Sequence, residues 1–97
     1  MPTFIILGNF TDQGVKSVKD SVKRADAIKE VAKKFGVTMK DIHWTMGPYD
    51  VIGTFEAPDG PSMTACSIAI AMAGNVRGQT LRAYDKEEMK GILKKLG

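Results

Sequence analysis

The segment DIHWTMGPYDVIGTFE, residues 41–56, decides the fold. In residues 41–46 apolar side chains alternate with polar ones, and this period of two is typical of a β-strand. Residues 47–50 are Gly-Pro-Tyr-Asp, with Pro48 suited to the second position of a tight turn. Residues 51–56 then form a further strand, so the segment predicts a β-hairpin.

Helical patterns flank this hairpin on both sides. From about residue 16 to residue 35, apolar side chains recur in steps of three and four, and Gly36 supplies a C-terminal stop. Residues 63–73 predict a second helix that is small and apolar nearly all round. The hairpin therefore lies between two helices along the chain.

The ends of the chain add two strands and a third helix. Residues 3–10 are rich in β-branched and aromatic side chains, which favours a strand that the Gln13-Gly14 pair ends. Residues 76–84 predict the last strand. Asp85 follows, and together with Glu88 it resembles a capping box that begins a C-terminal helix.

The order of these elements, β-α-β-β-α-β with an extra C-terminal helix, predicts an α+β fold. It is the ferredoxin-like arrangement, an antiparallel four-stranded sheet with two helices on one face. The 97 residues make one domain, residues 1–97. A chain of this length buries only about 65% of its unfolded surface, which is enough for a single core.

Composition excludes several classes of protein. The net charge of +3 is too small to indicate a nucleic-acid partner, and acidic residues interrupt the basic face of residues 16–35, which includes Arg24. The apolar segment 63–73 is shorter than the roughly 20 residues that span a bilayer. The N-terminus lacks a secretory pattern. We therefore expect a soluble cytoplasmic protein without membrane or nucleic-acid partners.

No motif for a cofactor or a metal is present. A single cysteine and a single histidine exclude an internal disulfide and a Cys/His zinc cluster. Neither a phosphate-binding glycine loop nor a metalloprotease motif occurs. We expect Cys66 to pack as a small hydrophobe, and we expect no cofactor and no metal.

The first strand is apolar on both faces. Phe4 and Ile6 point to one side, while Ile5 and Leu7 point to the other. Two helices cover only one face of such a sheet, and an uncovered apolar face marks an interface. We therefore favour a homodimer or higher homo-oligomer that forms through the sheet face and closes an α/β barrel. The alternative is that the C-terminal helix folds across the open face of its own chain.

Five polar residues are candidates for a ligand-binding site: His43, Tyr49, Asp50, Arg77 and Arg82. His43 faces the open side if Trp44 faces the helices, and it can carry a proton near neutral pH. Arg77 and Arg82 point to opposite faces and can bind an anion or form an intersubunit salt bridge. Tyr49 and Asp50 can bind a polar ligand. Alternatively, Asp50 satisfies backbone amides of the turn and Tyr49 covers the edge of the core.

Together these segments resemble the GYD-domain proteins over essentially the whole chain. The family is named for a Gly-x-Tyr-Asp element, which here is Gly47, Tyr49 and Asp50. The resemblance implies a dimeric α/β barrel with ferredoxin-like architecture, and it brings no established reaction. The segments that carry it are TFIILGNFTDQG, VKDSVKRADAIKEVAKKFGV, HWTMGPYDVIGTFEAPD and GNVRGQTLRAY.

Three functions are compatible with the sequence. The first is a small-molecule-binding barrel dimer without established catalysis, whose ligand cavity lies between the sheet and its partner near the five candidate residues. The second is a cofactor-free oxygenase or isomerase that uses His43 or Asp50 as its base. The third is a structural or assembly protein without a pocket. The sequence leaves open whether the protein is an enzyme.

Overall fold

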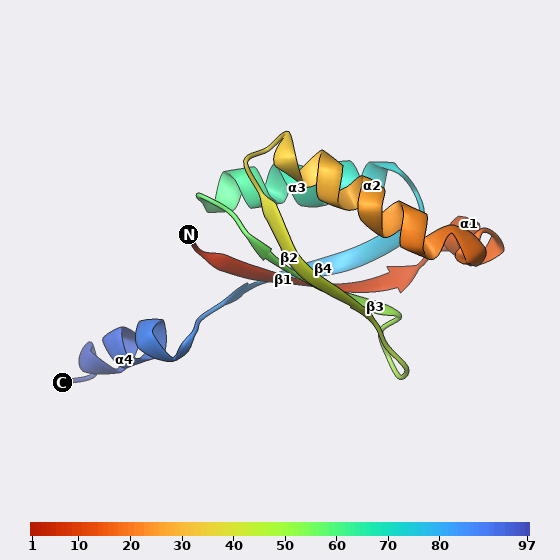
Figure 1. Ribbon diagram of the computed structural model, residues 1–97. Coiled ribbons are helices and arrows are strands. Elements are labelled where there is room, and N and C mark those ends of the chain that lie inside the picture. The colour runs from red at the N-terminus through yellow and green to blue at the C-terminus, as the bar shows by residue number, and fades with distance from the viewer.

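The predicted hairpin is present in the computed structural model, which describes residues 1–97. Its first strand begins at Thr38, three residues before the predicted start at residue 41. The register of the hairpin shifts between Met39 and Asp41, where Lys40 is the extra residue of a β-bulge. All neighbouring strands are antiparallel, in the order β2-β3-β1-β4 (Figure 1). This order confirms the ferredoxin-like prediction. The strands are β1 (Thr3–Phe10), β2 (Thr38–Trp44), β3 (Val51–Glu56) and β4 (Val76–Ala83).

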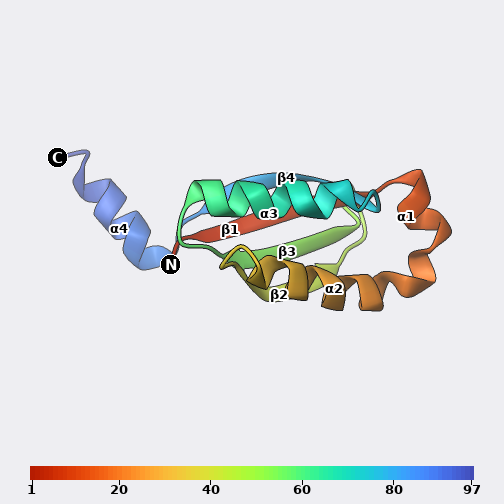
Figure 2. The ribbon, with the colours of Figure 1, turned by 90° about the horizontal axis from the view of Figure 1, so that it is seen from above.

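Two long helices, α2 and α3, lie side by side over one face of the sheet, as Figure 2 shows from above. The C-terminal helix α4 extends away from the sheet beyond the N-terminus of the chain (Figures 1 and 2). None of the helices is both long enough and apolar enough to cross a membrane. The helices are α1 (Asp12–Lys16), the 3₁₀ helix η1 (Val18–Asp20), α2 (Ser21–Lys33), α3 (Gly60–Met72) and α4 (Lys86–Lys94).

The prediction of a single helix over residues 16–35 was wrong in its first part. Three shorter elements, α1, η1 and α2, occupy residues 12–33. The Thr11 hydroxyl accepts a hydrogen bond from the Gly14 N–H at 3.1 Å and so caps α1. Gly14, predicted to end the first strand, lies buried inside this helix against Asn75. A Cβ at position 14 would lie 2.0 Å from the Asn75 carbonyl oxygen, so the glycine permits close contact between two segments.

The core fills the layer between the sheet and the two long helices. Alternation along β1 directs Phe4 and Ile6 into this layer, and Phe55 of β3 lies directly opposite Phe4. From the helices, Met63 and Cys66 of α3 are fully buried against them. Burial raises the pKa of the Cys66 thiol, which keeps it neutral and confirms that it packs as a hydrophobe.

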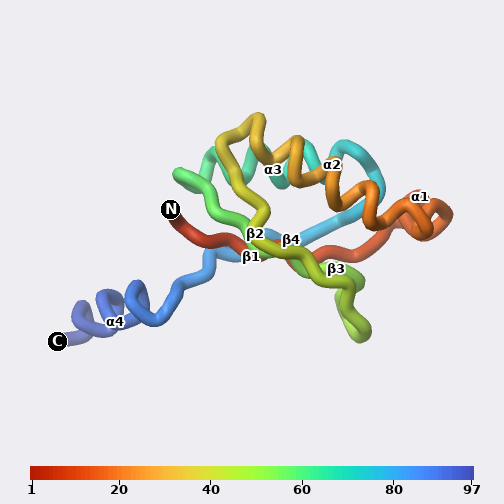
Figure 3. The backbone as a smooth tube through the Cα atoms, in the orientation of Figure 1, coloured from red at the N-terminus to blue at the C-terminus, as the bar shows by residue number.

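The other face of the sheet is not covered by any element of the chain. The backbone tube in Figure 3 places α2 and α3 on one side of the sheet and α4 beyond its end. The alternative in which the C-terminal helix folds across the open face is therefore wrong for this chain. The capping box predicted for this helix is confirmed, because Asp85 accepts from the Glu88 N–H at 2.7 Å and Glu88 accepts from the Asp85 N–H at 3.3 Å.

Candidate functional site

The Gly-x-Tyr-Asp element forms the loop that connects β2 to β3. Gly47 has a φ of 105°, a left-handed conformation that favours glycine. The Thr45 N–H donates to the Asp50 carbonyl at 2.9 Å, and the Thr45 hydroxyl donates to the Tyr49 carbonyl at 2.5 Å. These bonds close the loop on itself.

Asp50 also fastens this loop to the end of β1. Its Oδ2 accepts a hydrogen bond from the Phe10 N–H at 2.8 Å, and its N–H donates to the Gly8 carbonyl at 2.9 Å. A half-buried carboxylate that accepts a backbone N–H holds two segments that lie 40 residues apart in the sequence. The geometry therefore gives Asp50 a structural task, although the amide that it satisfies belongs to a neighbouring strand and not to its own turn.

His43 lies on the open face of the sheet, as alternation predicted. Its side chain is 73% exposed, and its Nδ1 lies 4.0 Å from Asp41 Oδ1. In the register of the sheet, His43 lies opposite Ile52 of β3. The imidazole is thus on an outer strand, at the rim of the open face.

The two arginines of β4 lie on opposite faces, also as predicted. Arg77 is exposed on the open face, where its register partner is Asn9. Because β2 and β4 are the two outer strands, three spacings between neighbouring strands, roughly 14 Å in all, separate the strand of His43 from the strand of Arg77. His43 and Arg77 share a face without sharing a site.

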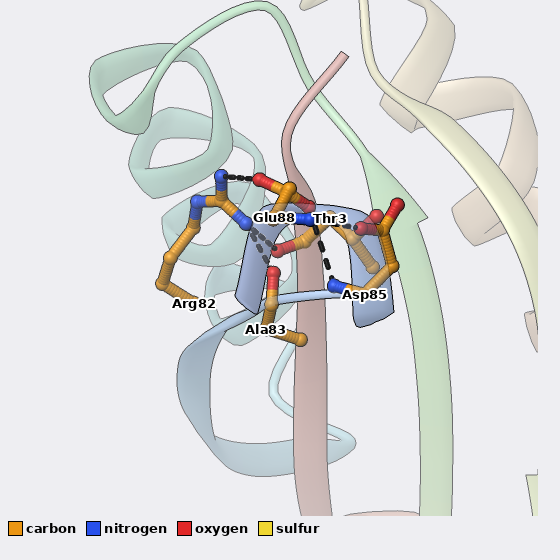
Figure 4. A network of polar contacts seen from close by, with 5 residues as sticks. All are labelled: Thr3, Arg82, Ala83, Asp85 and Glu88. Carbon is orange, nitrogen blue, oxygen red and sulfur yellow. Dashed lines mark hydrogen bonds and ion pairs between the residues drawn. The ribbon is translucent and has the colours of Figure 1, made fainter. Parts of the chain in front are cut away.

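Arg82 lies at the junction between β4 and α4 (Figure 4). Its Nη2 forms an ion pair with Glu88 Oε2 at 2.6 Å, and its Nη1 donates to the carbonyls of Thr3, at 3.3 Å, and Ala83. The guanidinium also lies 4.5 Å from the centre of the Tyr84 ring. Hydrogen bonds from Arg82 and then from the Asp85 backbone lower the pKa of Glu88. All these contacts are within one chain.

The five candidate residues consequently do not converge on one cavity. His43 and Arg77 occupy the rim of the open face, Tyr49 and Asp50 lie in the β2–β3 loop, and Arg82 anchors α4. Nor do any three His, Cys, Asp or Glu side chains group as a metal site would require.

The centre of the open face is apolar. In one row across the sheet, Ile52 and Leu7 lie between His43 and Gln79. In the next such row, Ile5 lies beside Leu81, which is 43% exposed. The polar residues around this centre include Asp41, His43, Thr54, Glu56, Arg77 and Gln79.

A second uncovered apolar surface lies on α4. Leu93 is 50% exposed, and Leu96, in the turn just after α4, is 81% exposed; Met89 and Leu93 lie on one face of the helix. Apart from the junction at Arg82, this face has no partner within the chain.

An apolar cavity lies on the helix side of the sheet, between the sheet and α2 and α3. Its volume is about 160 Å³, and 14 of its 18 lining residues are hydrophobic. None of the five candidate residues lines it. Its polar side chains are Ser21, Arg24 and Asn75.

Sequence patterns did not single out this cavity. They group Arg24 with the solvated lysines of the first helix, but it is half-buried and bonded to the carbonyls of Gly14 and Ser17. The available signal was the run of alanines in α3, because Ala69 and Ala73 face the cavity with side chains too small to fill it. The volume that small side chains leave empty depends on how the helices pack, which periodicity alone does not predict.

Fold and surfaces together define a ferredoxin-like α+β domain with an uncovered sheet face and one apolar cavity. The sequence model of the GYD-domain family matches residues 4–93, so the chain belongs to this family. It is 34% identical to the "Glutamine synthetase and cystathionine beta-lyase binding protein" of the bacterium Thermus thermophilus, over 97% of this chain and 100% of that protein.

A solved structure supports the fold independently. The crystal structure of TTHA0845, also from Thermus thermophilus, superimposes with a TM-score of 0.57, covering 88% of this chain and 95% of that one. The two sequences are 20% identical, so the likeness concerns the fold alone.

Proposed function

We propose that this GYD-domain protein is a cytoplasmic binding protein that works as a homodimer, with the open sheet faces of two copies packed together as an α/β barrel. The apolar centre of the open face, formed by Ile5, Leu7, Ile52 and Leu81, carries this proposal. No element of the chain covers these side chains, and burying them against a second copy removes apolar surface from water.

The mass in solution tests the homodimer. Light scattering of the wild-type chain should give twice the chain mass of 10.5 kDa. Leu7→Lys places a charge at the centre of the interface and should return the mass to that of one chain. Val22→Lys, at an exposed apolar position of α2, is the matched control and should remain dimeric. A wild-type mass of one chain at high micromolar concentration would refute the proposal.

We further propose that the partners of the homodimer are other proteins, bound through the exposed apolar face of α4. The relative named for binding two enzymes supports this extension, as does the absence of any intrachain partner for Leu93 and Leu96. The test is to measure, by surface plasmon resonance, the binding of this protein to purified glutamine synthetase from its own source organism. Leu93→Lys should abolish binding while Val22→Lys preserves it; equal binding by both variants would contradict a role for α4.

Binding of a small molecule is a second candidate function, and the cavity beneath α2 and α3 favours it. Small-molecule sites are typically concave, mostly apolar and equipped with a few polar groups, which describes this cavity. His43 and Asp50 are outside it, so this cavity does not support the oxygenase or isomerase alternative with either residue as its base. Thermal unfolding in the presence of small aromatic compounds tests this candidate, because a bound ligand raises the melting temperature.

A further inference from the structure

We propose that the cavity between the sheet and helices α2 and α3 binds a small apolar carboxylate of about the size of one aromatic ring, with Arg24 and Asn75 holding the carboxylate. The inference rests on the second candidate function, small-molecule binding, and specifies its ligand. It does not depend on the association of two copies.

The apolar part of the cavity fits a single ring. Its volume of about 160 Å³ is close to the roughly 150 Å³ of an engineered apolar cavity that holds benzene. Ile28 and Val31 of α2, Phe55 of β3 and Ile70 of α3 contribute apolar side chains to its wall. Because Ala25, Ala27, Ala69 and Ala73 also line it, small residues on both helices maintain the space.

The polar side chains come from one end of the fold. Ser21 and Arg24 are in the first turn of α2, and Asn75 precedes β4 beside the end of β1, where the Thr11 N–H donates to the Asn75 carbonyl at 3.1 Å. Arg24 lies 5.6 Å from the centre of the Phe10 ring, which also lines the cavity at the end of β1. A ligand bound here therefore has one polar end and one apolar end.

The polar groups left free at that end are hydrogen-bond donors. Arg24 uses Nη1 and Nη2 for its four hydrogen bonds, all to neutral oxygens, so its Nε–H is unused. The Asn75 side-chain oxygen accepts from Gln13 Nε2 at 2.9 Å, which leaves the Asn75 amide donors free. The Ser21 hydroxyl already donates to the Val18 carbonyl at 2.6 Å. Three free N–H donors, one on Arg24 and two on Asn75, match a carboxylate, which only accepts hydrogen bonds.

The charge of Arg24 is also uncompensated. None of the ion pairs in the chain includes Arg24, and its hydrogen-bond partners are two serine side chains and two carbonyl groups. Beside a wall of apolar side chains, a guanidinium without a counterion attracts an anion more strongly than it does in water. A carboxylate supplies the missing charge and accepts the free N–H donors, whereas a neutral ligand of the same shape does not.

Benzoate and benzyl alcohol are suitable probes, since they share a ring and differ in charge. Isothermal titration of the full-length chain should detect benzoate with a Kd of about 1 mM or lower and benzyl alcohol at least about tenfold more weakly. Arg24→Gln should weaken benzoate binding by about tenfold or more and leave benzyl alcohol unchanged. Lys23→Gln removes the same charge from an exposed neighbouring position and should retain wild-type affinity for both compounds.

Filling the cavity is the second test, and it leaves Arg24 and its structural hydrogen bonds intact. Ala69→Leu should abolish binding of both probes, whereas Ala71→Leu, on the exposed side of α3, should not. Equal binding of both probes, or an Arg24→Gln variant with wild-type benzoate affinity, would overturn the carboxylate assignment while small-molecule binding survives. Absence of binding by both probes at about 10 mM would overturn the carboxylate assignment and small-molecule binding together.

Discussion

At the scale of the residue, Asp50 shows how the family's name-giving element acts in this structure. The Asp50 carboxylate accepts the Phe10 N–H, and the Asp50 backbone N–H donates to Gly8, so the β2–β3 loop is fastened to the end of β1. Gly47 supplies the left-handed turn that brings the carboxylate to this position. The Gly-x-Tyr-Asp element thus stabilises the sheet through contacts that are visible in a single chain.

Replacing this carboxylate should cost stability. In Asp50→Asn the charge-assisted hydrogen bond to Phe10 becomes a weaker neutral one, and we expect a loss of about 1 kcal/mol in the free energy of unfolding, or about 4–8 °C in Tm. Asp26→Asn, at an exposed and unpaired position of α2, is the control and should change Tm little. Equal melting temperatures for the two variants in thermal unfolding would show that the loop is not fastened in this way.

Gly14 illustrates a residue whose role depends on a distant segment. Gly14→Ala would place a Cβ against the Asn75 carbonyl, so the loop before β4 must move, and we expect a loss of about 2 kcal/mol or more. Gly91→Ala is the matched control, because Gly91 lies inside α4 with no atom near the added Cβ and should gain about 0.5–1 kcal/mol of helix stability. Chemical denaturation of both variants measures these changes, and a gain for Gly14→Ala would contradict the close contact.

At the scale of the element, α4 is held by its capping box and by the ion pair between Arg82 and Glu88, and its apolar face stays uncovered. These contacts lower the pKa of Glu88 below that of an ordinary glutamate. A carboxylate with a lowered pKa contributes stability above its unfolded pKa of about 4.3, and the contribution is lost as the pH falls through the lower folded pKa. The attachment of α4 is therefore sensitive to acid.

We expect the helicity of α4 to fall as the pH drops from about 4.3 through the lower folded pKa of Glu88. Backbone chemical shifts of residues 86–94 in an NMR titration measure this change. Glu88→Gln should show reduced α4 helicity already at pH 7, while Glu87→Gln, which loses only an exposed contact to Lys90, should resemble the wild type. An α4 that responds identically in the two variants would mean that Arg82 does not anchor it.

At the scale of the whole molecule, local patterns in the sequence were sufficient for the fold. The turn at residues 47–50 and alternation in the strands predicted the sheet, the open-face position of His43 and the placement of Arg77 and Arg82 on opposite faces. Asp85 with Glu88 predicted the start of α4. Sequence patterns did not predict the role of residues whose surroundings depend on tertiary contacts. Gly14 resembles a chain breaker until the Asn75 carbonyl lies against it, and Arg24 resembles a solvated cation until α1 and η1 fold around it.

The central claim is that two copies bury the open sheet face against each other. Isotope-filtered NOE spectroscopy on an equimolar mixture of labelled and unlabelled chains observes that contact directly. We predict intermolecular NOEs from the methyl groups of Ile5, Leu7, Ile52 and Leu81, and none from Ile28 or Met63 on the helix side. Intermolecular NOEs that come only from the helix side or from α4, or that are absent at high micromolar concentration, would contradict the account.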